Sequence, residues 1–123
     1  MSDTVTDLMQ ANLLAVFNQR DPQARADAIA TTYATEVRWT DDEGVVTGHD
    51  ALDEKAAHLQ AGLAGMHFAP AGPVRQTRGF GFLAWEVRRD EDDAAVMTGF
   101  DVALIADGRI TDLWTVLTGP ASE

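Results

Sequence analysis

The chain has 123 residues, nearly half of them apolar and about a quarter charged, so residues 1–123 are expected to form one globular domain. The formal net charge of −11 disfavours nucleic acids and anionic membrane surfaces as partners, because an acidic surface repels both. No cysteine is present, which excludes a disulfide framework, thiol chemistry and thiolate metal sites.

The N-terminal third is predicted to be helical. Its start, MSDTVTDLMQ, lacks the basic and apolar regions of a signal peptide, and we expect a cytoplasmic protein. Apolar side chains that recur at helical spacing predict a helix over about residues 4–19. Asp21 suits the cap of a second helix, which we expect to carry Tyr33 and to end near Thr35.

A short hairpin and a third helix are predicted next. The β-branched and aromatic run EVRWTD predicts a strand, DDEG a turn, and VVTG a short returning strand. The segment HDALDEKAAHLQAG predicts the third helix, with Asp50 as its N-cap.

After Gly65 the apolar residues begin to alternate with polar ones, which is typical of strands. Pro70 and Pro73 are expected at a sheet edge or bulge, and Gly79 and Gly81 at a bend or a close backbone approach. The predicted strands are MHFAPAGPVRQT, GFGFLAWEVRR, AAVMTGFDVALIA and RITDLWTVLTG. Helices on one face of a curved, mostly antiparallel sheet make an α+β domain.

Asp41 is the first candidate for chemistry, because strand periodicity places it on the same face as Val37 and Trp39. The opposite face of this strand is wholly polar, so we assign the Trp39 face to the interior. A carboxylate that is partly buried among apolar groups is a stronger base. The alternative is that Asp41 lies beyond the strand and only caps the DDEG turn.

Asp101 is the second candidate, because it interrupts a strand that is apolar on both faces, TGFDVALIADG. A lone aspartate in such a strand is costly unless it is paired, hydrogen-bonded or protonated. The alternative is a structural aspartate that accepts hydrogen bonds from the backbone or from arginine.

Aromatic residues of the later strands are candidates for a pocket wall. Alternation places Trp85 inside with Leu83, and it places Leu113 and Thr115 inside on the last strand. Trp114 then faces outward, which suits an oligomer interface. Plain core packing is the alternative for each tryptophan.

His67, at the start of a strand, is a candidate pocket acid or base, or else a hydrogen-bonded histidine with a structural role. The histidines lack the spacing of a metal site, so no metal is expected. The only serines, Ser2 and Ser122, lie near the termini, which disfavours serine-nucleophile catalysis.

The order of elements resembles the SnoaL-like and ketosteroid isomerase-like branch of the nuclear transport factor 2-like superfamily, over nearly the whole chain. The resemblance is carried by FNQRDPQARADAIATTYATEVRWTDDEG, GHDAL and TGFDVALIADGRITDLWTVL. It implies a cone-shaped, curved, mostly antiparallel sheet wrapped around about three N-terminal helices, with a central pocket open at one end. It also implies a homodimer formed through the outer sheet face.

In this resemblance Asp41 falls on the catalytic base of ketosteroid isomerase, and Asp101 on its protonated oxyanion-hole aspartate. The oxyanion-hole tyrosine of that family aligns near Leu13, whereas the one tyrosine of this chain is Tyr33. The SnoaL-type cyclases use an aspartate with a histidine, and His67 could supply that histidine.

The sequence therefore predicts a small acid–base enzyme of isomerase or cyclase type, acting on an apolar, carbonyl-bearing ring compound such as a polyketide or terpenoid. Asp41 is the predicted base, Asp101 the protonated donor and His67 a second acid. No cofactor is expected. The alternative is a domain that binds a small hydrophobic ligand, or dimerises, without turnover. The predicted pocket residues are Trp39, Trp85, Phe82, Leu113, Tyr33 and Leu13.

Overall fold

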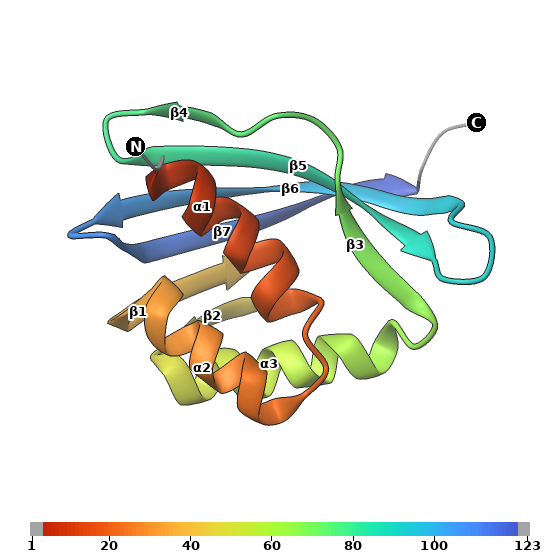
Figure 1. The fold of residues 1–123 in the computed structure, drawn as a ribbon, viewed down its shortest axis with the longest axis horizontal. Helices are drawn as coiled ribbons and strands as arrows, with labels where there is room; N and C mark the ends of the chain where they lie inside the picture. The colour runs from red at the N-terminus through yellow and green to blue at the C-terminus, as the bar shows by residue number, and fades with distance from the viewer. Residues whose placement is uncertain (1–3, 121–123) are drawn as a thin grey trace.

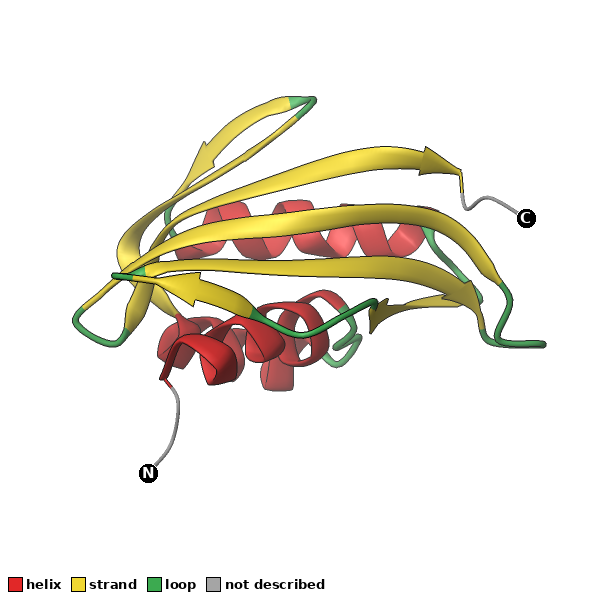
Figure 2. Ribbon diagram, turned by 90° about the horizontal axis from the view of Figure 1, so that it is seen from above, coloured by secondary structure: helices red, strands yellow, loops and turns green. Residues whose placement is uncertain are grey.

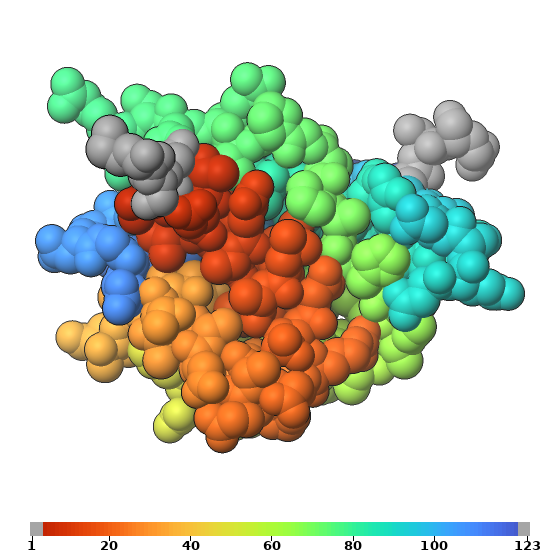
Figure 3. Space-filling model, in the orientation of Figure 1, coloured from red at the N-terminus to blue at the C-terminus, as the bar shows by residue number. Residues whose placement is uncertain are grey.

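Helices pack against the concave face of one curved sheet in this computed structural model, which describes residues 4–120 (Figures 1 and 2). Figure 3 shows the N-terminal helices, in red and orange, covering one side of the molecule. They border the green region of β3 (Met66–Pro70) and β4 (Arg75–Thr77) and the cyan hairpin of β5 (Phe80–Arg89) and β6 (Ala95–Ala106). No helix among residues 4–120 is long and apolar enough to cross a membrane. The helical segments are α1 (Thr4–Ala11), the π-helix η1 (Asn12–Phe17), α2 (Pro22–Thr32) and α3 (His49–Gly62).

The sheet has the strand order β2-β1-β7-β6-β5-β3, and the short strand β4 also pairs with β5. Only the β1–β7 pair is parallel; every other pair is antiparallel. The predicted α+β architecture, with a curved sheet around N-terminal helices, is confirmed. The strands are β1 (Tyr33–Asp41), β2 (Gly44–Thr47), β3 (Met66–Pro70), β4 (Arg75–Thr77), β5 (Phe80–Arg89), β6 (Ala95–Ala106) and β7 (Arg109–Pro120).

The first helix is not one continuous α-helix as predicted. Its second half is η1, in which the amide of Asn18 reaches back five residues to the carbonyl of Leu13, at 3.1 Å. The wider turn brings both Asn12 and Leu13 to the buried side, together with Val16 and Phe17. A polar amide thereby enters the core beside three apolar side chains.

Gln60, on α3, supplies the hydrogen bonds that the end of η1 lacks. Its amide nitrogen donates to the carbonyls of Val16 and Phe17, and its oxygen accepts from the guanidinium of Arg25 on α2 at 2.9 Å. Arg25 also pairs with Asp53 of α3. Buried polar groups that are satisfied in this way fix the relative position of three helices.

Two predicted boundaries are wrong by a few residues. The second helix ends at Thr32 rather than near Thr35, because Tyr33 is extended (φ −113°, ψ 147°) and pairs with Ile110 of β7. The N-cap of the third helix is Gly48 rather than Asp50, because Gly48, at φ +90°, accepts the first helical hydrogen bond at its carbonyl.

The predicted strand MHFAPAGPVRQT is divided into β3 and β4. Pro70 ends β3, and the chain leaves the sheet edge through Pro73 before it pairs again with β5. The edge position of both prolines is as predicted, since proline cannot donate to the ladder.

Close backbone packing behind the tryptophans depends on Gly99 of β6. A Cβ atom at this position would lie 2.5 Å from two ring carbons of Trp85 and 2.6 Å from the carbonyl oxygen of Val116. Gly81 similarly leaves room for the side chain of Met9 on α1. The indole of Trp85 therefore lies close to the β6 backbone at Gly99, which sets its position for the site described next.

Gly99→Ala is expected to destabilise the protein by about 1–3 kcal/mol, because the added methyl group displaces the Trp85 ring or the β7 backbone. Urea unfolding measures this change. Gly62→Ala is the matched control, because its Cβ would meet open space at the end of α3, and it is expected to be neutral or slightly stabilising. Equal stability of the two variants would contradict the packing assigned to Gly99.

Candidate active site

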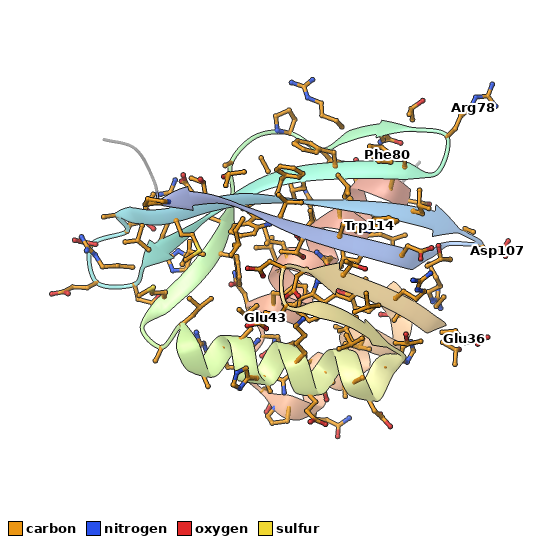
Figure 4. All side chains as sticks on the ribbon, turned by 180° about the vertical axis from the view of Figure 1, so that it is seen from behind. Glu36, Glu43, Arg78, Phe80, Asp107 and Trp114 are labelled. Atoms are coloured by element: carbon orange, nitrogen blue, oxygen red, sulfur yellow. The ribbon has the colours of Figure 1, made fainter. Side chains whose placement is uncertain are left out.

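A cavity of about 200 Å³ lies between the helices and the concave face of the sheet. Its inner wall is aromatic and aliphatic, and its mouth lies where the β1–β2 turn approaches the C-terminal half of α3. Figure 4 shows Glu43 at this end of the hairpin, with Glu36 at the other end. The inner wall consists of Leu13, Phe17, Trp39, Phe68, Trp85, Val87, Asp101 and Thr115, and the mouth includes Asp41, Asp42, Glu43, Leu59, Leu63, Met97 and Leu117.

Asp101 is a carboxyl group inside this apolar wall and is only 2% exposed. On β6 it lies between Leu83 of β5 and Thr115 of β7. Its Oδ1 accepts hydrogen bonds from Trp85 Nε1 at 3.1 Å and from the Thr115 hydroxyl at 2.9 Å. Its Oδ2 accepts one, from Asn12 Nδ2 at 2.8 Å. Oδ2 thus has the remaining lone pair for a proton.

Burial raises the pKa of Asp101 to about 6, although the hydrogen bonds from Trp85, Thr115 and Asn12 each lower it. Removal from water penalises the charged carboxylate, and here this cost exceeds the stabilisation from three donors. A carboxyl group with this pKa exchanges its proton near neutral pH, as a general acid or base requires. The predicted buried aspartate in an apolar strand is therefore found in the cavity wall.

Two further hydrogen bonds support the groups around Asp101. The Trp39 indole donates to the Thr115 hydroxyl at 3.0 Å, and the Tyr33 hydroxyl donates to Asn12 Oδ1 at 2.5 Å. The sequence interpretation missed Asn12. A signal was available, because Asn12 lies four residues after Leu8 and three after Met9, on the apolar face of the predicted helix.

Asp41 is the last residue of β1, lines the mouth of the cavity and also accepts a hydrogen bond inside the turn. Its Oδ1 accepts from the Glu43 amide at 2.9 Å and from Lys55 Nζ at 2.6 Å. Among residues 4–120, no hydrogen-bond donor contacts its Oδ2. Lys55 Nζ also lies 4.9 Å from the centre of the Trp39 ring. A cation–π contact and an ion pair thus hold the ammonium group between the tryptophan and the carboxylate.

The structure brings five of the predicted site residues together at the cavity and places four elsewhere. Those at the cavity are Leu13, Trp39, Asp41, Trp85 and Asp101. Those outside its lining are Tyr33, His67, Phe82 and Leu113.

Each of these four positions has a physical reason. His67 is on the edge strand β3, 38% exposed, and its Nδ1 pairs with Asp90 at 2.7 Å in the β5–β6 hairpin. Phe82 points to the convex face, where its ring lies 5.3 Å from that of Phe100, because Leu83 and Trp85 take the inner face of β5. Leu113 and Tyr33 are buried in the core beyond the cavity wall.

No group of three or more metal-ligating side chains gathers anywhere in residues 4–120. The polar contacts at the cavity are mostly hydrogen bonds between side chains, to which Lys55 and Asp41 add an ion pair. The arrangement supports proton transfer between a buried carboxyl group and a bound molecule.

Comparison with known proteins shows that residues 11–113 match the SnoaL-like domain family. No curated protein matches the chain. A solved structure of a candidate isomerase of the SnoaL-like family from Agrobacterium tumefaciens is similar, with 22% identity, a TM-score of 0.86, and coverage of 94% of this chain and 98% of that chain.

Two other similar structures have been assigned candidate activities. A candidate ketosteroid isomerase from Kribbella flavida has 14% identity and a TM-score of 0.68, with 98% of this chain and 81% of that chain covered. A candidate polyketide cyclase from Sinorhizobium meliloti has 18% identity and a TM-score of 0.66, with 94% of each chain covered. At these identities the similarity establishes the fold.

The raised pKa of Asp101 predicts a specific pH dependence of stability. Between the ordinary carboxyl pKa and about 6, the native protein keeps a proton that the unfolded chain has lost, so stability falls as pH rises through this window. Relative to Asp101→Asn, which has no proton to exchange, the wild type should lose about 2–3 kcal/mol between acidic and neutral pH. Urea unfolding of both proteins from acidic to neutral pH measures this loss of stability. Parallel curves of unfolding free energy against pH for the two proteins would contradict the prediction.

Proposed function

The chain belongs to the SnoaL-like domain family of the nuclear transport factor 2-like superfamily, and we propose that its cavity catalyses proton transfer on a carbonyl-bearing ring compound. The reaction is of the isomerase or cyclase type. The observation that supports this most strongly is the buried Asp101, whose pKa of about 6 suits proton exchange, in a wall of aromatic side chains. A second carboxylate, Asp41, lies at the mouth of the same cavity.

In the proposed isomerisation, Asp41 removes a proton from the carbon next to the carbonyl group, and Asp101 gives its proton to the carbonyl oxygen. The product of this step is an enol. Return of a proton from Asp41 to a different carbon, and of the enol proton to Asp101, completes the reaction without a co-reactant. Oδ2 of each carboxyl group is the atom assigned to the transfer, because Oδ1 of each already accepts two hydrogen bonds.

The enol intermediate fits Asp101 in either protonation state. When the proton is on the ligand, the Asp101 carboxylate accepts a hydrogen bond from the enol; when the proton is on Asp101, the carboxylic acid donates to an enolate oxygen. In both cases one proton lies between the ligand oxygen and Asp101 Oδ2. Removal from water strengthens this hydrogen bond, as it does for other polar groups inside a low-dielectric cavity.

The walls and mouth support an apolar and uncharged substrate. Trp39, Phe68 and Trp85 offer aromatic surfaces for a ring system, and the mouth adds Leu63 and Met97. Three carboxylates at the mouth are opposed by the single ammonium group of Lys55, which is already paired. An anionic substrate would therefore be repelled at the entrance. Polyketide-like and terpenoid-like rings are the substrate class that we propose, with no external cofactor.

A planar phenolic steroid, which mimics the enol, is expected to quench tryptophan fluorescence saturably, because Trp39 and Trp85 line the cavity. Asp101→Asn should weaken its affinity at least about tenfold, because a neutral amide forms a weaker hydrogen bond to the phenol than the carboxyl group does. Asp41→Asn should leave this affinity within about threefold, since the phenol has no proton for Asp41 to remove, but should abolish turnover of a ketone substrate.

Asp112→Asn, on the convex face of β7, is the matched control and should bind like the wild type. Equal affinity of Asp101→Asn and the control would contradict the role of Asp101. Saturable binding without turnover of any ketone tested would favour the second candidate function, a ligand-binding domain without catalysis. The apolar cavity supports that candidate as well.

The convex face of the sheet supports a proposed homodimer. Apolar side chains lie side by side across three central strands, because Phe82, Val102 and Trp114 are register partners on β5, β6 and β7. Figure 4 views the molecule from behind, with Trp114 on β7 and Phe80 on β5. Phe80, Leu104 and Val116 of this convex face are among the exposed large apolar residues. An apolar patch that spans a sheet is typical of a protein–protein interface.

Val116→Glu is expected to convert the proposed dimer to a monomer, because it buries a charge in the middle of the interface. Sedimentation velocity at high micromolar concentration measures the state. Leu14→Glu, at a similarly exposed leucine on the helical side, should leave the dimer intact. A wild type that sediments as a monomer would contradict this interface.

A further inference from the structure

We infer that Tyr33 and Asn12 are a positioning pair: the Tyr33 hydroxyl fixes the orientation of the Asn12 amide, and that orientation determines how Asp101 holds its proton. The inference rests on the proposed function, in which Asp101 exchanges a proton with the ligand. It gives Tyr33 a role behind the cavity wall, where the structure places it, in place of the predicted contact with substrate.

Tyr33 must be a hydrogen-bond donor in this structure. Its ring is 1% exposed, and burial, with the nearby charge of Asp101 as the smaller cause, raises the pKa of its hydroxyl well above the ordinary value. The hydroxyl therefore keeps its proton at every physiological pH. Its partner is Asn12 Oδ1, at 2.5 Å.

This donation settles which end of the Asn12 amide faces Asp101. An amide oxygen and nitrogen are interchangeable in shape, so hydrogen-bond partners decide their placement. With Oδ1 accepting from Tyr33, Nδ2 must face Asp101 Oδ2, where it lies at 2.8 Å. Asn12 thus donates to the oxygen that is assigned to proton transfer.

The reversed amide would have the opposite effect on Asp101. A donor facing Oδ2 stabilises the carboxylate, whereas an amide oxygen in the same place repels the carboxylate and accepts from the carboxylic acid. Without the Tyr33 hydroxyl, the hydrogen bond to Asp101 is the one remaining side-chain contact among residues 4–120 that orients the Asn12 amide, and protonation of Asp101 weakens this preference. Tyr33 therefore favours the ionised form of Asp101, although the two side chains share no hydrogen bond.

Few charged groups near Asp101 could influence its protonation in addition to Tyr33 and Asn12. The direct partners of Asp101 come from η1, β5 and β7 and are Asn12, Trp85 and Thr115, none of which titrates near neutral pH. The charged groups that line or adjoin the cavity are all near its mouth: Asp41, Asp42, Glu43 and Lys55. These four charged groups are unchanged in every variant used below, so they do not contribute to a difference in Asp101 titration between variants.

The positions of Asn12 and Tyr33 depend on two features of the fold that the sequence analysis did not predict, the π-helix and the early end of α2. The π-helix turns Asn12 toward the sheet, and the early end of α2 makes Tyr33 the first residue of β1. A regular helix through residue 19, followed by a helix through residue 35, would keep neither side chain where it is. The pair is thus built by the two local departures from regular helix.

The indole N–H resonances of the three tryptophans give a direct readout that needs no substrate. Trp85 donates to Asp101, Trp39 reaches it through Thr115, and Trp114 lies on the opposite face of the sheet. In the wild type the Trp85 resonance should titrate with a midpoint near 6, and the Trp114 resonance should not follow it. Tyr33→Phe should raise the Trp85 midpoint by about 0.5–1 pH unit, the value of one neutral hydrogen bond.

Asn12→Leu tests whether Tyr33 acts through Asn12, because it replaces the amide with an apolar side chain of similar size. In this background, Tyr33→Phe should no longer shift the midpoint, since Tyr33 acts only through Asn12. An unchanged midpoint in Tyr33→Phe would overturn the inference. An equal shift in the presence and absence of Asn12 would also overturn it, because Tyr33 would then act on Asp101 directly.

The wild type alone gives a second measurement if a variant does not fold. The side-chain amide resonances of Asn12 should titrate with the same midpoint as Trp85, since its Nδ2 contacts Asp101. Asn12 amide resonances that do not shift with pH around this midpoint would overturn the inference. Failure of the phenolic steroid to bind would contradict the proposed function and leave these midpoints unaffected, so the two failures are distinguishable.

Discussion

The burial of one carboxyl group among aromatic side chains is the constraint on which the rest of this structure depends. Asp101 is placed at the centre of the sheet, where an ionised carboxylate loses its hydration, and three side-chain donors from three elements replace part of it. Gly99 allows Trp85 to lie close to β6, and the π-helix turns Asn12 inward. Each of these features is energetically unfavourable by itself, and each helps to place or to hydrogen-bond the carboxyl group of Asp101.

The balance between desolvation and hydrogen bonding gives the site its chemistry. Fewer donors would leave Asp101 protonated at neutral pH, and a wetter site would leave it ionised like a surface aspartate. With both effects present its pKa is about 6, so the group can give or accept a proton as the ligand requires. Asp41 differs because Lys55 and a backbone amide pair with it near solvent. The two carboxyl groups of one cavity thus have different environments, as acid–base pairs commonly do.

Periodicity and turn chemistry were enough to predict the α+β class and to single out Asp41 and Asp101, which the structure places at the cavity. Alternation placed Trp39 with Asp41, and the lone Asp101 in an apolar strand was visible without a structure. Other features depend on long-range contacts that local pattern does not contain. The π-helix that begins at Asn12 is stabilised at its C-terminal end by Gln60 of the distant helix α3, and Tyr33 leaves its helix to pair with β7. His67 and Phe82 were predicted at the pocket, but strand order placed one at the sheet edge and the other on the convex face.

The central claim is that Asp101 Oδ2 exchanges a proton with the oxygen of the bound ligand. A crystal structure with a planar phenolic steroid bound tests this claim most directly. The account predicts that the rings lie between Trp39 and Trp85, with the phenolic oxygen within hydrogen-bonding distance of Asp101 Oδ2. A steroid bound in the reverse direction, with its phenol at Lys55 in the mouth, would contradict the claim. A steroid found only on the convex face of the sheet would contradict it as well.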